Sequence, residues 1–167
     1  MRREMKAVSM VARSTGSGRA RRVYAVDVGY GQLAWKLRSD PRVVAIERTN
    51  IRHMDAGALP EPVDLATIDT AFISLRLVVP ATLPFLRPGG RILALIKPQF
   101  EVGRGQVGKG GVVRDPGQHR SVIQDLNAFF RAAGLEVEAV VPSPVLGPRG
   151  NREFIVSMRV PGEDTAV

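Results

Sequence analysis

The chain has 167 residues, of which 44% are hydrophobic and 24% are charged, as is typical of one soluble globular domain with a single core. Cysteine is absent, which excludes disulfide scaffolds, thiol catalysis and cysteine–zinc sites. Two isolated histidines, His53 and His119, are too few for a histidine-rich metal site, and we expect both on the surface. No apolar run reaches the roughly 20 residues that span a bilayer, so no membrane partner is expected and the cytoplasm is the default location.

The net charge of +8 is concentrated at the start of the chain. Residues 1–22 carry seven basic residues and one acid, whereas the remaining 145 residues carry 17 basic and 15 acidic ones. This head lacks the apolar core of a secretory signal, and a basic tail or irregular start is favoured over an Arg-rich transit peptide. We therefore expect a basic irregular N-terminal segment (1–22), an α/β domain (23–160) and a short tail (161–167).

From residue 23 onward, β-type segments alternate with helical ones. Strands are expected at 23–28, 43–46, 63–69, 91–96, 135–141 and 154–160. Helices are expected at 32–38, 73–86 and 116–133, with a glycine-rich loop over 98–115. Such alternation predicts an α/β fold with a mostly parallel sheet. The last two strands have no helix between them and should form an antiparallel pair at the sheet edge.

Three charged residues lie at strand ends or just before a strand. Asp69 and Lys97 end two expected strands, and Glu153 precedes the last one. Ligands of open α/β sheets gather at the carboxyl ends of the strands. A lysine between two carboxylates can act as a proton acceptor or an electrostatic clamp, but a simple salt-bridge cluster would give the same spacing. The spacing alone leaves both interpretations open.

Two further features have a functional and a plain interpretation. Asp27, near the end of the first strand, could bind ribose hydroxyls or could cap the turn at Gly29. The loop around 103–111, with Arg104, Lys109 and Arg114, could be a mobile basic lid over an anionic substrate or a solvated surface loop. It lacks the spacing of a P-loop.

Read as strings, several segments resemble the TlyA/hemolysin-A-like RNA methyltransferases, relatives of the FtsJ-type ribose 2′-O-methyltransferases. The resemblance covers about residues 21–160, and its segments are VYAVDVGYGQLAWKLR, ERTNIR, DLATIDTAFISL, LALIKPQFEVGRGQVGKGGVVRDP and SPVLGPRGNREFIV. The KPQFE block with VGKGGVVRDP, and GNREF in the last strand pair, are specific to this family.

The resemblance implies an S-adenosylmethionine-dependent methyltransferase domain with a Rossmann-like sheet. It implies cytidine 2′-hydroxyls of ribosomal RNA as substrate, the RNA or ribosomal subunit as partner, and no metal. By their positions in the motifs, Asp69, Lys97 and Glu153 would be catalytic. Asp27 would bind the cofactor ribose, and Thr49 and Asn50 its adenine. Basic side chains would hold RNA phosphates, namely Arg104, Lys109, Arg149 and Arg152.

The front of the chain departs from the family pattern. We expect the family's small RNA-binding domain to be absent. The family's first catalytic lysine precedes the first strand of the sheet, where Lys6 is the only lysine and gives no secure match. Ser14-Thr15-Gly16 echo the glycine-rich cofactor loop, yet eight residues separate Ser14 from Val23, fewer than the dozen or so that a parallel crossover needs. We therefore expect an N-terminally truncated member with an incomplete first strand region and impaired activity.

Two other functions remain in view. The damaged cofactor loop favours a catalytically inactive RNA-binding remnant of the family. A small-molecule α/β enzyme is the third possibility, against which the KPQFE and GNREF blocks argue.

Overall fold

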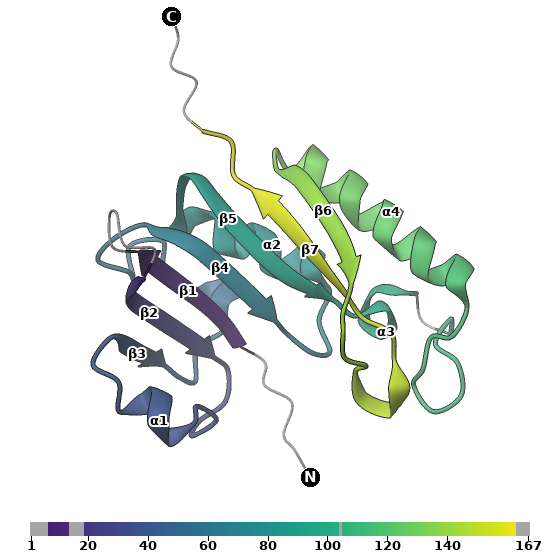
Figure 1. Ribbon diagram of the computed structural model, residues 1–167, viewed down its shortest axis with the longest axis horizontal. Helices are drawn as coiled ribbons and strands as arrows, with labels where there is room; N and C mark the ends of the chain where they lie inside the picture. Colours follow the sequence, from purple (N-terminus) through teal and green to yellow (C-terminus); the bar gives the residue numbers. More distant parts are fainter. Residues whose placement is uncertain (1–6, 14–18, 104, 163–167) are drawn as a thin grey trace, which may run out of the picture.

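A computed structural model describes residues 7–13, 19–103 and 105–162. Within these residues the chain forms one seven-stranded sheet of order β3-β2-β1-β4-β5-β7-β6 (Figure 1). The strands are β1 (Ala7–Arg13), β2 (Ala20–Asp27), β3 (Val43–Ile46), β4 (Val63–Asp69), β5 (Leu86–Ile96), β6 (Glu136–Pro142) and β7 (Phe154–Arg159). The helices are α1 (Trp35–Arg38), α2 (Leu75–Thr82), α3 (Pro98–Glu101) and α4 (Pro116–Ala132), with 3-10 turns η1 (Ile51–His53), η2 (Leu83–Phe85) and η3 (Pro148–Gly150).

The strand directions confirm a mixed α/β sheet. β2 pairs with β3, and β4 with β5, in parallel, while β7 is antiparallel to both β5 and β6. Of the seven strands in the described part of the chain, β1 and β7 run against the other five. The expected antiparallel pair at the edge is therefore present as β6 and β7.

The first strand corrects the expected boundary at residue 22. Ala7–Arg13 form β1 in the middle of the sheet, and β2 already begins at Ala20. β1 is antiparallel to both neighbours: Ala7 pairs with Asp27 and with Asp69. Because only six residues join β1 to β2, the two strands can form a hairpin but not a parallel crossover. The Ser14-Thr15-Gly16 segment lies outside the described residues.

The hydrophobic core lies between the sheet and α2 and α4, which Figure 1 shows behind β4 and β5 and beside β6. α4 begins at an Asp115 cap, whose carboxylate accepts the N–H groups of Gly117 and Gln118. Its buried face includes Leu126 and Phe130. Successive residues of β5 alternate in solvent exposure: Ile92 and Ala94 are fully buried, whereas Leu93 is 37% exposed. The described helices therefore cover one face of the sheet at β5, the face on which the core forms.

Several local expectations change in the structure. The helix expected at 73–86 is α2 followed by the short turn η2, and the helix expected at 32–38 is a single turn at Trp35–Arg38. β5 begins earlier than expected, at Leu86. Residues 86–90 form an extended strand alongside β4 and do not form the end of a helix.

His119 is buried, at 6% exposure, and not on the surface as expected. Its Nε2 donates to the carbonyl of Val113 at 2.9 Å and its ring packs edge-on against Phe154. His53 is exposed, as expected. Among the described helices, none is both long and apolar enough to cross a membrane.

Candidate active site

Asp69 and Lys97 meet at the carboxyl ends of the neighbouring parallel strands β4 and β5. Lys97 follows Ile96, the last residue of β5, and its Nζ lies 2.7 Å from Oδ1 of Asp69. The lysine side chain is 8% exposed, while the aspartate is 56% exposed. A buried ammonium thus has a carboxylate that faces solvent. This geometry holds the lysine head at the rim and leaves one side of the pair open to a ligand.

Glu153 reaches the same rim from β7. In the antiparallel pairing of β5 and β7, Ile96 lies opposite Phe154, so Lys97 and Glu153 occupy neighbouring positions just past that pair. Glu153 is 6% exposed, and its Oε1 accepts a hydrogen bond from Nε2 of Gln99 at 3.2 Å. The β-sheet therefore brings all three expected catalytic side chains to one edge.

Gly147 is the residue that makes room for the Glu153 carboxylate. A Cβ at position 147 would overlap Oε1 of Glu153 and lie 2.5 Å from its Cδ. We expect Gly147→Ala to displace the carboxylate and to lower the free energy of unfolding by about 1–3 kcal/mol, the usual range for overpacking. Chemical denaturation measures this change. Gly162→Ala, where a Cβ would meet open space, is the matched control and should be neutral.

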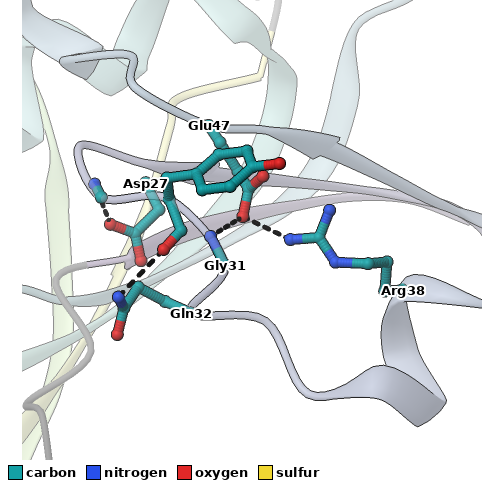
Figure 2. Close-up of polar contacts among 7 residues, drawn as sticks. Asp27, Gly31, Gln32, Arg38 and Glu47 are labelled. Carbon is teal, nitrogen blue, oxygen red and sulfur yellow. Dashed lines mark hydrogen bonds and ion pairs between the residues drawn. The ribbon is translucent and has the colours of Figure 1, made fainter.

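Asp27 ends β2 and organises the turn that follows. Its Oδ1 accepts the N–H of Gly29 at 2.7 Å (Figure 2). Its carbonyl accepts the N–H of Thr49 at 3.0 Å. One carboxylate oxygen of Asp27 therefore caps the turn at Gly29. The side chain is half-buried, which leaves the carboxylate able to meet a ligand as well.

Glu47 is a residue of this loop that the sequence analysis missed. Its Oε1 accepts the N–H of Gly31 at 2.7 Å and pairs with the guanidinium of Arg38, so it joins the end of β3 to the turn after β2 (Figure 2). The Arg38 hydrogen bond lowers the pKa of Glu47, and the Gly31 N–H adds to this lowering. The signal that could have found it is the acid that directly follows the β-type run 43–46 in ERTNIR.

An apolar cavity of about 130 Å³ lies beside Asp27, between β2, η1 and the start of α2. Thr49, Asn50 and Thr70 contribute its polar edge, and Val26 and Ile51 are among its apolar walls. Oγ1 of Thr70 is buried and has no hydrogen-bond partner among the described residues. Such an atom is expected to find a partner on a bound group. Because an engineered cavity of roughly 150 Å³ holds benzene, this one suits an aromatic ring system and not a whole extended ligand.

A wider pocket of about 530 Å³ is lined by Gln99, the hydrogen-bond partner of Glu153, and by Asn151. Phe72 and Phe100 line it, with ring centroids 4.8 Å apart, and Phe72 is 72% exposed with a positive φ of 61°. A large aromatic side chain held exposed in this strained conformation is a feature of functional sites. Sequence analysis did not single out either phenylalanine, although Phe72 follows Asp69 within the same motif.

The expected RNA-binding residues spread over several places. Arg149 is exposed at the wider pocket, where its Nη1 donates to the carbonyl of Gly110 at 2.6 Å. Lys109 is exposed on the glycine-rich loop, and Arg152 is exposed beside Glu153. Arg104 lies outside the described residues. The structure therefore places Arg149 against the loop that carries Lys109, but directs Arg152 to a different pocket.

Glu101 ties the start of α2 to α3. It accepts hydrogen bonds from the Ser74 hydroxyl at 2.6 Å and from the Leu75 N–H at 2.8 Å. Burial raises the pKa of Glu101 above its ordinary value, and the hydrogen bonds from Ser74 and Leu75 offset part of that rise.

This raised pKa predicts a pH-dependent stability. The folded chain holds the Glu101 proton more tightly than the unfolded chain, so its contribution is full below pH 4.5 and is lost as the pH rises through the folded pKa. We expect Glu101→Gln to make the fall in unfolding free energy with rising pH shallower. Urea denaturation across this range measures the slope, and the exposed Glu136→Gln controls for net charge. An unchanged slope in Glu101→Gln would contradict the prediction.

Within the described residues, no three histidine or carboxylate side chains gather in a way that could hold a metal ion. What gathers instead is an acid at the end of β2, a nearby apolar cavity and a lysine between acids at the ends of β4, β5 and β7. An α/β sheet of order 3-2-1-4-5-7-6 with such a rim defines the methyltransferase class of fold.

Comparison with known proteins agrees with this class. The chain belongs to the FtsJ-like methyltransferase family, which matches residues 7–160. It is 48% identical over 145 residues to the "Putative rRNA methyltransferase YqxC" of Bacillus subtilis, covering 86% of this chain and 52% of that protein. It is 46% identical over 140 residues to the 16S/23S rRNA (cytidine-2′-O)-methyltransferase TlyA of Mycobacterium tuberculosis, covering 84% and 52%.

A solved structure also agrees with this family. The "Putative hemolysin" of Streptococcus thermophilus superposes with a TM-score of 0.83 at 41% identity, over 89% of this chain and 55% of that one. The chain spans about half the length of the curated relatives it matches.

Proposed function

We propose that the chain is the catalytic domain of an S-adenosylmethionine-dependent ribose 2′-O-methyltransferase that acts on cytidine in ribosomal RNA. The observation that carries this proposal is the buried Lys97 ammonium, paired with Asp69 at 2.7 Å at the rim where Glu153 also arrives. The names of the TlyA relatives support the substrate, because these proteins methylate the cytidine 2′-oxygen of rRNA. A location in the cytoplasm, where ribosomal subunits are assembled, follows from this substrate.

The rim residues have separate tasks in this reaction. S-adenosylmethionine, when bound, supplies an already activated methyl group. The Asp69 carboxylate fixes the ammonium of Lys97, which would orient the 2′-hydroxyl and stabilise negative charge on its oxygen. The hydroxyl proton would pass to solvent water on the open side of the pair, where Asp69 is 56% exposed. Glu153, held by Gln99 and enclosed by Gly147, lies at the position beside Lys97 in the pairing of β5 with β7 and adds a second negative charge to the rim.

The residues at the end of β2 suit the nucleoside end of the cofactor. The cavity of about 130 Å³ accepts one ring system, with Thr49, Asn50 and the unpartnered Thr70 hydroxyl at its edge. Asp27 lies where a ribose attached to that ring would emerge, and Glu47 holds the neighbouring loop in place. The exposed Phe72 provides an aromatic face on which an RNA base can stack.

The methionine end of the cofactor is supported less well. β1 runs antiparallel, so its amino end lies between Asp27 and Asp69. If the first strand were parallel, a tight turn would follow it at this place and would bind the methionine end of the cofactor. This feature favours the second candidate function, an RNA-binding member of the family with little or no methyl transfer.

Transfer of a labelled methyl group distinguishes the two functions. The chain is incubated with tritiated S-adenosylmethionine and ribosomal subunits, and the RNA is digested to nucleosides and analysed by mass spectrometry. The first function predicts 2′-O-methylcytidine, and a base-methylated nucleoside would contradict it. RNA binding without any label in the RNA would support the second function.

A further inference from the structure

A separate pocket of about 480 Å³ lies between the start of α4 and the start of β7. Three arginines line it: Arg114, which precedes the α4 cap, Arg120, one turn into α4, and Arg152, which precedes β7 by two residues. The buried ring of His119 and the ring of Phe154 form part of its floor. Three positive charges from two distant parts of the sequence, the start of α4 and the segment before β7, thus converge on one concave surface.

These three guanidinium groups are available to a ligand. Each arginine is exposed, and none makes a side-chain hydrogen bond or ion pair with another residue that the structure describes. Five other arginines of the described chain have carboxylate partners, namely Arg21 with Glu61, Arg38 with Glu47, Arg42 with Asp40, Arg87 with Asp64 and Arg91 with Glu138. The pocket therefore has a concentrated positive charge that the described residues do not neutralise.

The nearest acids along the chain point elsewhere. Asp115 follows Arg114, but its carboxylate caps α4 through the N–H groups of Gly117 and Gln118, at 2.9 and 3.3 Å. Glu153 follows Arg152, but it is buried against Gly147 and accepts a hydrogen bond from Gln99. Since no carboxylate lines the pocket, a multivalent oxyanion is the ligand that its charge recognises.

The pocket is close to the proposed methyl-transfer site but on the other side of one extended segment. Asn151 lines the wider pocket together with Gln99, the partner of Glu153, whereas Arg152 and Phe154 line the arginine pocket. Consecutive Cα atoms are only about 3.8 Å apart, so an anion at Arg152 lies next to the segment that carries Glu153. A chain with repeated phosphates could occupy both pockets at once.

We propose that Arg114, Arg120 and Arg152 clamp one backbone phosphate of the substrate RNA near the nucleotide that receives the methyl group. This inference rests on the proposed RNA substrate. The three arginines fix the position of the RNA chain without reading its sequence, as phosphate contacts do. His119, held by Val113, is a reporter at the floor of the pocket.

The test uses the full chain and a short fluorescein-labelled oligocytidylate in fluorescence anisotropy. The triple variant Arg114→Gln, Arg120→Gln, Arg152→Gln should weaken binding roughly 10- to 100-fold, the value of one or more lost charged hydrogen bonds. Loss of one phosphate contact on a single strand should also reduce the slope of log affinity against log salt by about 0.7.

Two further variants make the result specific. Arg131→Gln removes one positive charge, against three in the triple variant, from the other end of α4 outside this pocket, and should leave affinity and slope nearly unchanged. Replacing the three arginines with lysine keeps the charge but loses the planar fork, so the salt slope should stay while the affinity falls by less than in the glutamine variant. In the His53→Asn background, the single remaining histidine gives an NMR ring signal that RNA should shift.

Several outcomes would overturn the proposal. Equal weakening by Arg131→Gln would show a general charge effect. A His119 signal that moves with inorganic phosphate but not with RNA would assign the pocket to a free anion, and competition by polyglutamate equal to that by unlabelled RNA would assign it to an acidic protein segment. RNA binding that depends on the arginines in a chain that transfers no methyl group would contradict the enzymatic function and leave the pocket assignment intact.

Discussion

Isothermal titration of this chain with S-adenosylmethionine is expected to show weak or undetectable binding. The cavity near Asn50 and the carboxylate of Asp27 can hold the nucleoside end, but the backbone at Ala7 is committed to the strand pairs with β2 and β4. Two lost hydrogen bonds to the charged methionine end, each worth about 1.5 kcal/mol, correspond to roughly 100-fold in affinity.

A chimera provides the control for this expectation. Residues 1–22 are replaced with the corresponding segment of the Bacillus subtilis relative, which is 48% identical to this chain. The chimera should bind S-adenosylmethionine about 100-fold more tightly, because the residues at the ends of β2, β4 and β5 are unchanged. Low-micromolar binding by the chain itself would contradict the prediction and show that β1 builds a working pocket in its reversed direction.

Lys97→Met in that chimera is expected to lower the rate of methyl transfer by about 10²- to 10³-fold, the usual cost of losing one positioned group that stabilises developing negative charge. Its effect on stability should be small, because methionine fits the buried stem and the remaining Asp69 is 56% exposed and can be solvated. Asp69→Asn should cost more stability, about 1–3 kcal/mol, since it leaves a buried ammonium without its carboxylate. Rate assays and chemical denaturation measure the two effects.

Lys36→Met on α1 is the matched control for Lys97→Met. Lys36 is an exposed lysine in the last turn of that short helix, so its loss should change neither rate nor stability appreciably. If Lys97→Met kept full activity, the Asp69–Lys97 pair would be a structural salt bridge, which is the plain interpretation that the strand-end spacing also allows.

The order of the elements after residue 40 could be read from the sequence because each segment has its own periodicity. The strands at Val43–Ile46 and Val63–Asp69 have the expected bounds, and α4 begins at the expected Pro116, next to its Asp115 cap. Placing Asp69, Lys97 and Glu153 at one rim also followed, since parallel strands end at the same edge. Local patterns were sufficient for the bounds of these elements because the bounds depend on residues close together in the chain. The shared rim required in addition the general rule about where strand ends meet in an α/β sheet.

The tertiary structure decided the features that depend on contacts between residues far apart in the chain. β1 could not be placed from its own residues, because its direction is set by the short connection to β2 and by the register of Ala7 between Asp27 and Asp69. The burial of His119 depends on Phe154, 35 positions away in the chain, and the gathering of Arg114, Arg120 and Arg152 depends on how α4 packs beside β7. The sequence by itself determined which chemical groups stand at strand ends, whereas packing between remote segments determined which of them are buried, paired or left facing a pocket.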